Sequence, residues 1–169
     1  IDFIKQLQEK KNPEVSGFIS REKLKAGLQN EVSELPENLD NIPLPAWHLL
    51  NMSEYIHQRG RRHVETIEYE QNRVATVVTS RGCPFFCTFC ASHTVHGRKM
   101  RYRSSENIIE ELDILNEKYQ TTTIVPEDDL FAVNKPRFLK LADAIEKRNY
   151  DFEWQFSNGL SVAVLDDEV

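Results

Sequence analysis

Three cysteines fall within eight consecutive positions of the chain, at Cys83, Cys87 and Cys90. Their spacing, C-x3-C-x2-C, lets one compact loop wrap three thiolates around one face of an iron–sulfur cubane, and thiolates are soft ligands that suit such clusters. A four-iron cluster ordinarily takes four cysteines, and the sequence contains no fourth. The spacing therefore predicts a three-thiolate iron–sulfur site whose fourth iron stays open to an outside ligand.

A zinc site is the main alternative for the same segment. His93 follows Cys90 by three residues and would complete a Cys3His set, with His96 as a spare ligand. Zinc sites, however, usually pair two knuckles that are far apart in the sequence, and they rarely lie at the carboxyl end of a buried strand. We therefore interpret the two histidines as loop residues. Redox-active or inert thiols are the third alternative for the cysteines.

Polar side chains also follow two later segments with strand-like patterns. Glu127, Asp128 and Asp129 come after a β-branched run, and Asn158 follows an alternating aromatic run. The carboxyl ends of parallel strands meet at one edge of a sheet, so these side chains are expected near the cysteines. Each acid could instead cap the next helix or hold an arginine, and Asn158 could be a turn residue beside a glycine.

Five segments would position these residues, in the order strand, helix, strand, helix, strand. The strands are predicted at residues 74–79, 121–125 and 152–156, from β-branched or alternating aromatic residues. One helix, capped by Ser104 or Ser105, would bury Ile108, Leu112, Leu115 and Tyr119; the next, capped by Asn134 with Pro136 in its first turn, would bury Phe138, Leu141, Ala142 and Ile145. This winding predicts an α/β fold with a parallel sheet and right-handed crossovers.

The residues before the first of these strands have a different sequence pattern. Three prolines and several polar residues between positions 35 and 45 indicate an extended linker, and an apolar pattern predicts a helix that starts near Pro45. Shorter patterns predict a helix tail at residues 1–10 and strands at residues 15–19 and 64–69. Trp47 and Trp154 are expected to pack in cores.

The composition is that of an ordinary globular domain, with 40% hydrophobic and 28% charged residues among 169. No run approaches the roughly 18–20 apolar residues that span a bilayer. The opening residues lack the pattern of a secretory signal, and clustered thiols then indicate a reducing compartment, so a cytoplasmic protein is expected. The chain opens at Ile1 rather than methionine and stops where another helix would start, so we interpret it as a piece of a longer protein.

Charge is unevenly distributed. Residues 55–103 carry nine Lys or Arg against three Asp or Glu, although the whole chain has a net charge of −6. Such a basic segment could attract a nucleic acid or a phosphate. We favour solvated loops around an anionic cofactor, and no nucleic-acid partner is expected.

The sequence around the cysteines resembles a known family. C-x3-C-x2-C with an aromatic residue before the last cysteine, here Phe89, is the signature of radical S-adenosylmethionine (SAM) enzymes. The stretches TSRGCPFFCTFCAS, RYRSSENIIEEL, EDDLF and NKPRFLKLADAI resemble the cobalamin-binding-type branch. LDNIPLPAWHLL is similar to the segment that joins the cobalamin domain of that branch to its barrel.

The resemblance implies a fold, cofactors and partners. Cys83, Cys87 and Cys90 would hold a [4Fe-4S] cluster whose open iron chelates SAM, and one electron would cleave SAM to methionine and a 5′-deoxyadenosyl radical. Phe89 would lie near the adenine, and Glu127, Asp128, Asp129 and Asn158 would be cofactor-binding candidates. The electron donor would be a flavodoxin or ferredoxin, the substrate a small molecule, and cobalamin would be bound by a domain outside the chain.

The implied fold is a partial TIM-like (β/α) barrel, truncated after about two and a half β/α units and preceded by an extended linker. Residues 1–34 would be the tail of an upstream domain, 35–60 the linker and a helix, and 61–169 the first part of the barrel. A piece of this kind would expose apolar surface and could self-associate. A methyltransferase is one function of that branch. A zinc-stabilised RNA-binding module and an RNA-modifying methylthiotransferase are the alternatives.

Overall fold

The computed structural model describes residues 4, 6, 8, 9, 19–28, 35–58, 73–162 and 166. The strand predicted at residues 64–69 and most of the one predicted at 15–19 lie outside these residues. The chain divides into two compact units, Ile1–Pro36 and Glu37–Val169. Unit 1 contains α2, Arg21–Lys25, which begins where the Ser20 side chain accepts a hydrogen bond from the Lys23 amide.

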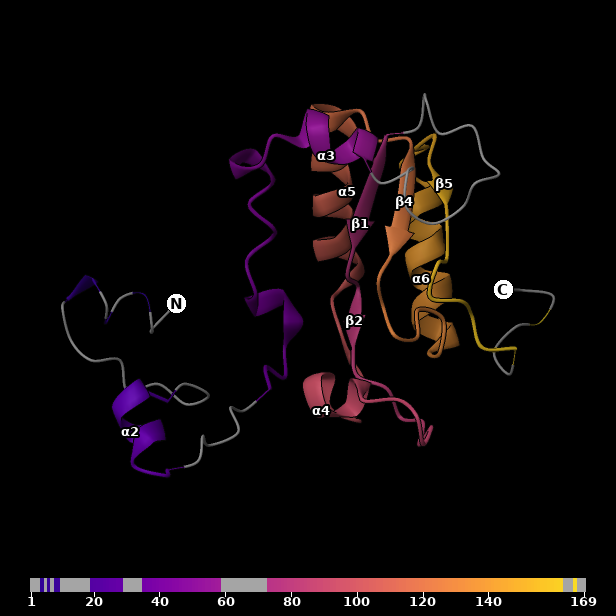
Figure 1. Cartoon of the computed structure of the whole chain (residues 1–169). Helices are drawn as coiled ribbons and strands as arrows, with labels where there is room; N and C mark the ends of the chain where they lie inside the picture. Colours follow the sequence, from indigo (N-terminus) through magenta and orange to yellow (C-terminus); the bar gives the residue numbers. More distant parts are fainter. Residues whose placement is uncertain are drawn as a thin grey trace. The chain divides into compact units, whose positions relative to one another are not determined.

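Unit 2 holds the elements that matter for the cysteines (Figure 1). In chain order they are η1 Leu39–Asn41, η2 Trp47–Leu49, α3 Met52–Gln58, β1 Val74–Val77, β2 Ser80–Arg81, α4 Ser92–His96, β3 Arg101–Tyr102, α5 Ser105–Tyr119, β4 Thr123–Pro126, α6 Lys135–Glu146 and β5 Glu153–Trp154. The predicted order of strands and helices is confirmed. The helix predicted from Pro45 is wrong at its start, because a separate 3-10 turn, η2, precedes α3.

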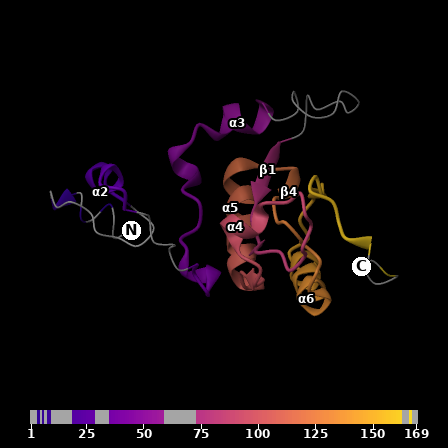
Figure 2. The same cartoon turned by 60° about the horizontal axis from the view of Figure 1, so that its bottom comes forward.

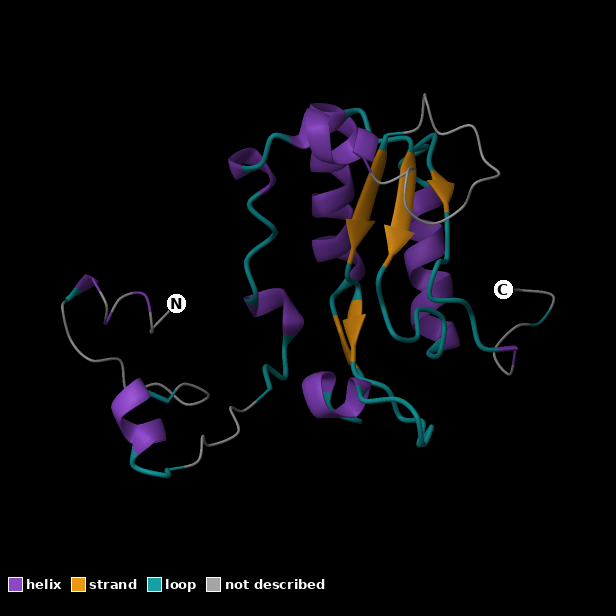
Figure 3. Ribbon diagram, viewed as in Figure 1, coloured by secondary structure: helices purple, strands orange, loops and turns teal. Residues whose placement is uncertain are grey.

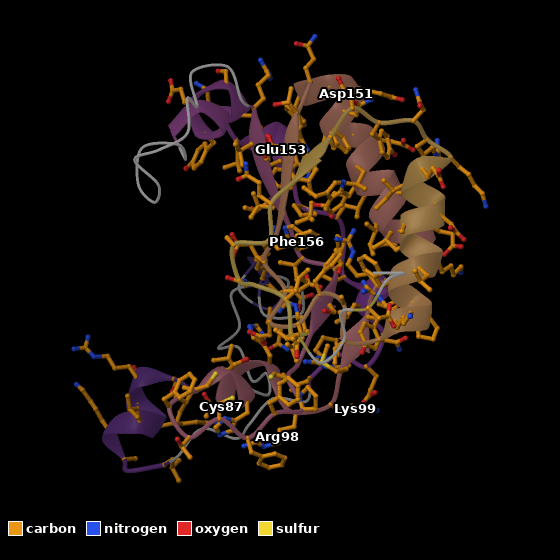
Figure 4. The ribbon with its side chains drawn as sticks, turned by 90° about the vertical axis from the view of Figure 1, so that its right-hand side faces the viewer. Cys87, Arg98, Lys99, Asp151, Glu153 and Phe156 are labelled. Atoms are coloured by element: carbon orange, nitrogen blue, oxygen red, sulfur yellow. The ribbon has the colours of Figure 1, made fainter. Side chains whose placement is uncertain are left out.

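The main sheet is parallel, with strand order β1-β4-β5. Val77 is paired with Pro126, and Ile124 with Trp154. Both crossovers step in the same direction, so right-handed connections place α5 and α6 on the same face. Figure 4 shows both helices on one side of the strands. The sheet is open, as a part of a β/α barrel would be.

The helices form where their caps predict. The Ser104 side chain accepts a hydrogen bond from the Asn107 amide at the start of α5, and Asn134 accepts one from the Arg137 amide at the start of α6. The core between helices and sheet contains Ala75, Val77, Ile108, Leu112, Leu115, Ile124 and Leu141. Apolar residues at helical spacing thus become one buried face, as predicted.

Three details differ from the sequence prediction. Pro126 is the last residue of β4 rather than the residue after it. Only two residues of the third predicted strand are paired, although Phe152, Trp154 and Phe156 all pack against the core. Ala142 is exposed, because it lies beside the stripe that α6 buries, on a flank that the sheet does not cover.

Downstream of β1 the chain forms a second, antiparallel pair that the sequence did not reveal. β2 pairs with β3, with Ser80 opposite Tyr102 and Arg81 opposite Arg101. The Arg103 amide donates to the Thr79 carbonyl and extends the pair by one bond. Figure 3 shows these short strands running on from the carboxyl end of β1 toward α4. This pair closes the base of the segment that carries the cysteines.

No helix in the described part of the chain is both long and apolar enough to cross a membrane.

Candidate metal centre

The cysteines lie in a long excursion between β2 and β3, residues 82–100, which we call the cysteine loop. Figure 2 turns this end of the sheet toward the reader. The Cys83 amide donates to the Gly97 carbonyl at 3.2 Å, so the first cysteine is held against the returning chain. Farther along, the Cys90 amide donates to the Cys87 carbonyl at 3.2 Å. The loop therefore presents one cysteine at its base, one at its tip and one on the way back.

All three thiols are free, with Cys83 and Cys90 half-buried and Cys87 exposed. Among the described residues, no three His, Cys, Asp or Glu side chains are grouped closely enough to hold a metal ion. The fold thus brings the three cysteines onto one loop without gathering their sulfur atoms. In number and softness the donor set fits a [4Fe-4S] cluster with one open iron, and ligand sets of this kind commonly close when the metal binds.

Aromatic and basic side chains surround the tip of the loop. Phe85, Phe86 and Phe89 are all exposed, Phe89 to 91%. The Arg98 guanidinium stacks over the Phe86 ring at 3.9 Å and donates to the Phe85 carbonyl at 2.7 Å. Figure 4 shows Cys87, Arg98 and Lys99 at the opposite end of the molecule from Asp151 and Glu153. The tip is thus an exposed apolar surface with a guanidinium stacked on it.

Asp128 has a different environment from the loop tip. It is only 3% exposed, and its carboxylate accepts three hydrogen bonds: from the Thr79 amide at 2.6 Å, the Thr79 hydroxyl at 2.5 Å and the Ser80 hydroxyl at 2.5 Å. Arg137 from α6 donates to the Thr79 hydroxyl at 2.8 Å, so a half-buried guanidinium faces the carboxylate through one hydroxyl. Asp128 therefore links the end of β4 to the residues that enter the cysteine loop.

The other predicted residues lie around Asp128. Asp129 accepts a hydrogen bond from the Ser92 hydroxyl at 2.5 Å, and Ser92 begins α4 directly after the cysteines. Asn158 donates from its side-chain amide to the Asp128 carbonyl at 3.2 Å. Glu127 is half-buried, and its amide donates to the Val77 carbonyl. The sheet thus brings the acidic segment, Asn158 and the cysteine loop to one edge, while contact of these residues with a cofactor stays a prediction.

The sequence interpretation missed the partners of these acids. Thr79, Ser80, Ser92 and Arg137 were not singled out, because their roles depend on the register between β1 and β4. The two histidines belong to α4 rather than to an irregular loop, which corrects their interpretation. Arg103 pairs with buried Glu111 of α5, not with the acidic segment. A pocket of about 250 Å³ lies beside this ion pair, between the linker and β1.

The buried position of Asp128 predicts a pH dependence. Burial raises the pKa of Asp128, and hydrogen bonds from Ser80 and Thr79 only partly oppose it. An acid whose pKa is higher in the folded chain than in the unfolded chain destabilises the fold when it is ionised. The contribution of Asp128 to the free energy of unfolding therefore falls as pH rises above about 3.9, the pKa of an aspartate in the unfolded chain. Urea unfolding at pH 4 and pH 7 should show wild type losing stability relative to Asp128→Asn. If the free energy of unfolding of wild type instead rose relative to that of Asp128→Asn between pH 4 and pH 7, the prediction would be wrong.

Comparison with known proteins decides the family. A family model described as the Radical SAM superfamily matches residues 77–165, more than half of the chain. The chain belongs to the radical SAM superfamily. The family resemblance of the cysteine loop is thereby confirmed, and this is a superfamily of enzymes. In this radical SAM chain the match begins at the end of β1 and includes the cysteine loop, both helices of the β/α core and Asn158.

Relatives of this radical SAM chain include methyltransferases. It is 36% identical over 73% of its length to a protein of Pyrococcus horikoshii described as an uncharacterized methyltransferase. It is 28% identical over 85% of its length to the cytidylyl-2-hydroxyethylphosphonate methyltransferase of Streptomyces wedmorensis, and 28% identical over 56% to the hopanoid C-3 methylase of Methylococcus capsulatus. The chain spans 24%, 26% and 18% of these relatives, about a quarter or less of each.

Proposed function

We propose that the radical SAM chain binds a [4Fe-4S] cluster through Cys83, Cys87 and Cys90, as part of an enzyme that reductively cleaves SAM. One observation carries the proposal: three free thiols, and no more, lie on one loop at the carboxyl end of a parallel sheet, within the segment that matches the superfamily. Such edges are where β/α folds collect their chemistry. The exposure of Cys87 leaves its sulfur accessible to a cluster.

The cluster, when bound, would supply the electron that cleaves SAM and an open iron for the amino and carboxylate groups of its methionine part. The protein's own residues would hold and orient the cofactor. We propose Glu127 for the methionine ammonium, because a carboxylate is a strong acceptor for a charged donor. Phe89 is proposed to lie against the adenine, since its ring is exposed beside Cys90. Asn158 would contribute a polar group from the loop after β5.

Methyl transfer is the reaction we propose for the protein to which the chain belongs. Its support is the names of the relatives, which include two methyltransferases and a hopanoid methylase. One relative from Rubrivivax gelatinosus, 24% identical over 79% of the chain, is instead an anaerobic magnesium-protoporphyrin IX monomethyl ester cyclase, so ring formation is the second candidate. A cobalamin, bound by a domain outside this chain, is the proposed methyl carrier.

We also propose the assignment of the segments and of the partner. Residues 1–34 would be the tail of the cobalamin domain, 35–60 the linker and a helix, and 61–169 the first part of the barrel. The electron donor would be a flavodoxin or ferredoxin acting in the cytoplasm. The basic character of the cysteine loop, with Arg98 and Lys99 at its surface, would suit an acidic donor.

Electron paramagnetic resonance (EPR) tests the proposal. The full chain is reconstituted anaerobically with iron and sulfide, reduced, and measured with and without SAM. We expect a [4Fe-4S]⁺ signal that shifts when SAM is added. A chain that retains zinc and forms no cluster would instead support the zinc-binding alternative. A cluster whose signal ignores SAM would leave the cluster proposal standing and would show that this chain alone does not hold SAM, as expected if residues of the rest of the barrel are needed.

A further inference from the structure

We propose that Asp128 and Asp129 are positioning residues, which hold the chain on either side of the three cysteines against the segment that follows β4. The inference rests on the proposed function for its purpose, since the loop matters as a cluster ligand. It differs from the expectation that these two acids bind SAM, because it assigns their side chains to the loop.

The first observation is the direction of the Asp128 hydrogen bonds. All three come from Thr79 and Ser80, which lie four and three positions before Cys83, respectively. The carboxylate is buried, so each bond acts in a medium of low dielectric and is stronger than a surface bond would be. Arg137 holds the same threonine from the opposite side, at its carbonyl and its hydroxyl. The entry to the loop is therefore fixed to β4 and to α6.

The second observation concerns the residues that follow the last cysteine. Asp129, the next residue, accepts the Ser92 hydroxyl at 2.5 Å, and Ser92 lies two positions after Cys90. The Ser92 amide in turn lies 3.5 Å from the Cys90 sulfur as a donor. A chain of two contacts thus joins the Asp129 carboxylate to a thiol. Two consecutive acids that follow β4 therefore bind residues on either side of the three cysteines.

The hydrogen bonds of Asp128 and Asp129 show how two neighbouring acids hold different parts of the chain. The Asp128 carboxylate contacts Thr79 and Ser80, whereas the Asp129 carboxylate contacts Ser92, so the two neighbouring side chains reach different partners. Asn158 additionally binds the backbone carbonyl of Asp128. With the chain held on both sides of the cysteines, the residues between these contacts need to lose less conformational freedom when the three thiols gather around a cluster.

Thiol alkylation in the metal-free full chain tests the inference without any cluster. The rate at which iodoacetamide modifies each cysteine is measured by mass spectrometry. Asp129→Ala and Ser92→Ala should each raise the Cys90 rate about tenfold, the effect of losing one charge-assisted hydrogen bond. Asp128→Ala should raise the Cys83 rate instead. Cys87, at the exposed tip, serves as an internal reference whose rate should not change.

Matched variants separate positioning from charge. Asp129→Asn removes the charge but keeps an oxygen that can accept the Ser92 hydroxyl, so it should restore a near wild-type Cys90 rate. Ser92→Ala removes the contact without changing any charge, and combining it with Asp129→Ala should add nothing. Equal rates in Asp129→Asn and Asp129→Ala, with no effect of Ser92→Ala, would show a purely electrostatic influence and overturn the inference.

Two further controls exclude general destabilisation. Asp151→Ala changes an exposed acid at the other end of the sheet and should leave all rates unchanged (Figure 4). If an aspartate variant raises all three rates together, in step with a lower urea midpoint, the acid only stabilises the fold and the inference fails.

Iron loading of the same variants at limiting iron should fall for Asp129→Ala and not for Asp129→Asn. A wild type that takes up no cluster would refute the proposed function while the alkylation pattern still decides the positioning role.

Discussion

Alanine at Cys87 is expected to abolish cluster binding while the chain stays folded. The side chain is exposed, so its removal should leave the free energy of unfolding within about 0.5 kcal/mol of wild type. The three thiolates, by contrast, are the whole proposed protein ligand set, and an iron–sulfur cluster with two cysteine ligands is not expected to persist. Iron bound after anaerobic reconstitution should fall from about four atoms per chain to nearly none.

Thr88→Ala is the matched control for this prediction. Thr88 is the next residue, is exposed on the same loop and offers no thiolate. It should bind iron as wild type does and give the same EPR signal. Equal iron in Cys87→Ala and wild type would refute the assignment of Cys87. If wild type contains zinc and the variant loses it, the same experiment identifies the metal as zinc.

Alanine at Gly82 is expected to distort the base of the cysteine loop. Gly82 has φ 103°, in the left-handed region that side chains rarely adopt. A Cβ placed there would lie 2.3 Å from the Lys99 carbonyl oxygen and 2.9 Å from its carbon, and both are backbone atoms of the returning chain. The unfavourable φ alone should cost about 1–3 kcal/mol, and the collision adds to that cost. We expect lower stability and impaired cluster loading together.

Gly159→Ala separates the two causes. Its φ is 76°, but no atom lies within 4 Å of the added Cβ, so only the backbone conformation is penalised. Urea unfolding should therefore show a smaller loss for Gly159→Ala than for Gly82→Ala, and iron loading should fall only in the latter. If Gly82→Ala has the same urea midpoint and the same iron content as wild type, the close approach to Lys99 has no role in the loop.

Local patterns in the sequence predicted most of the β/α core. Ser104 and Asn134 cap α5 and α6 as expected, and Ile108, Leu112 and Leu115 are fully buried. Capping and helical spacing involve residues only three or four positions apart, so a single sequence contains the needed information. The parallel sheet followed from the alternation of strands and helices, which leaves few topologies.

The site was predictable in its types of residue but not in its connections. The cysteines were identified from their spacing, and the acidic segment and Asn158 from their positions after strands, and the structure does bring these segments to one edge. The hydrogen bonds from Thr79 and Ser80 to Asp128 join residues 48 and 49 positions apart. They depend on the exact register of β1 against β4, which no local pattern specifies. The β2–β3 pair escaped prediction because two-residue strands leave no periodicity.

The closed base of the cysteine loop makes it a separate unit of stability. Because β2 and β3 pair just before the first cysteine, opening the residues between them need not break any bond between β1 and β4. Native proteins open in such cooperative pieces, each with its own free energy. Amide hydrogens of residues 84–96 should therefore exchange with solvent by a local route, at rates that denaturant barely changes. The metal-free chain could rearrange this piece to take up the proposed cluster while the sheet beneath it stays protected.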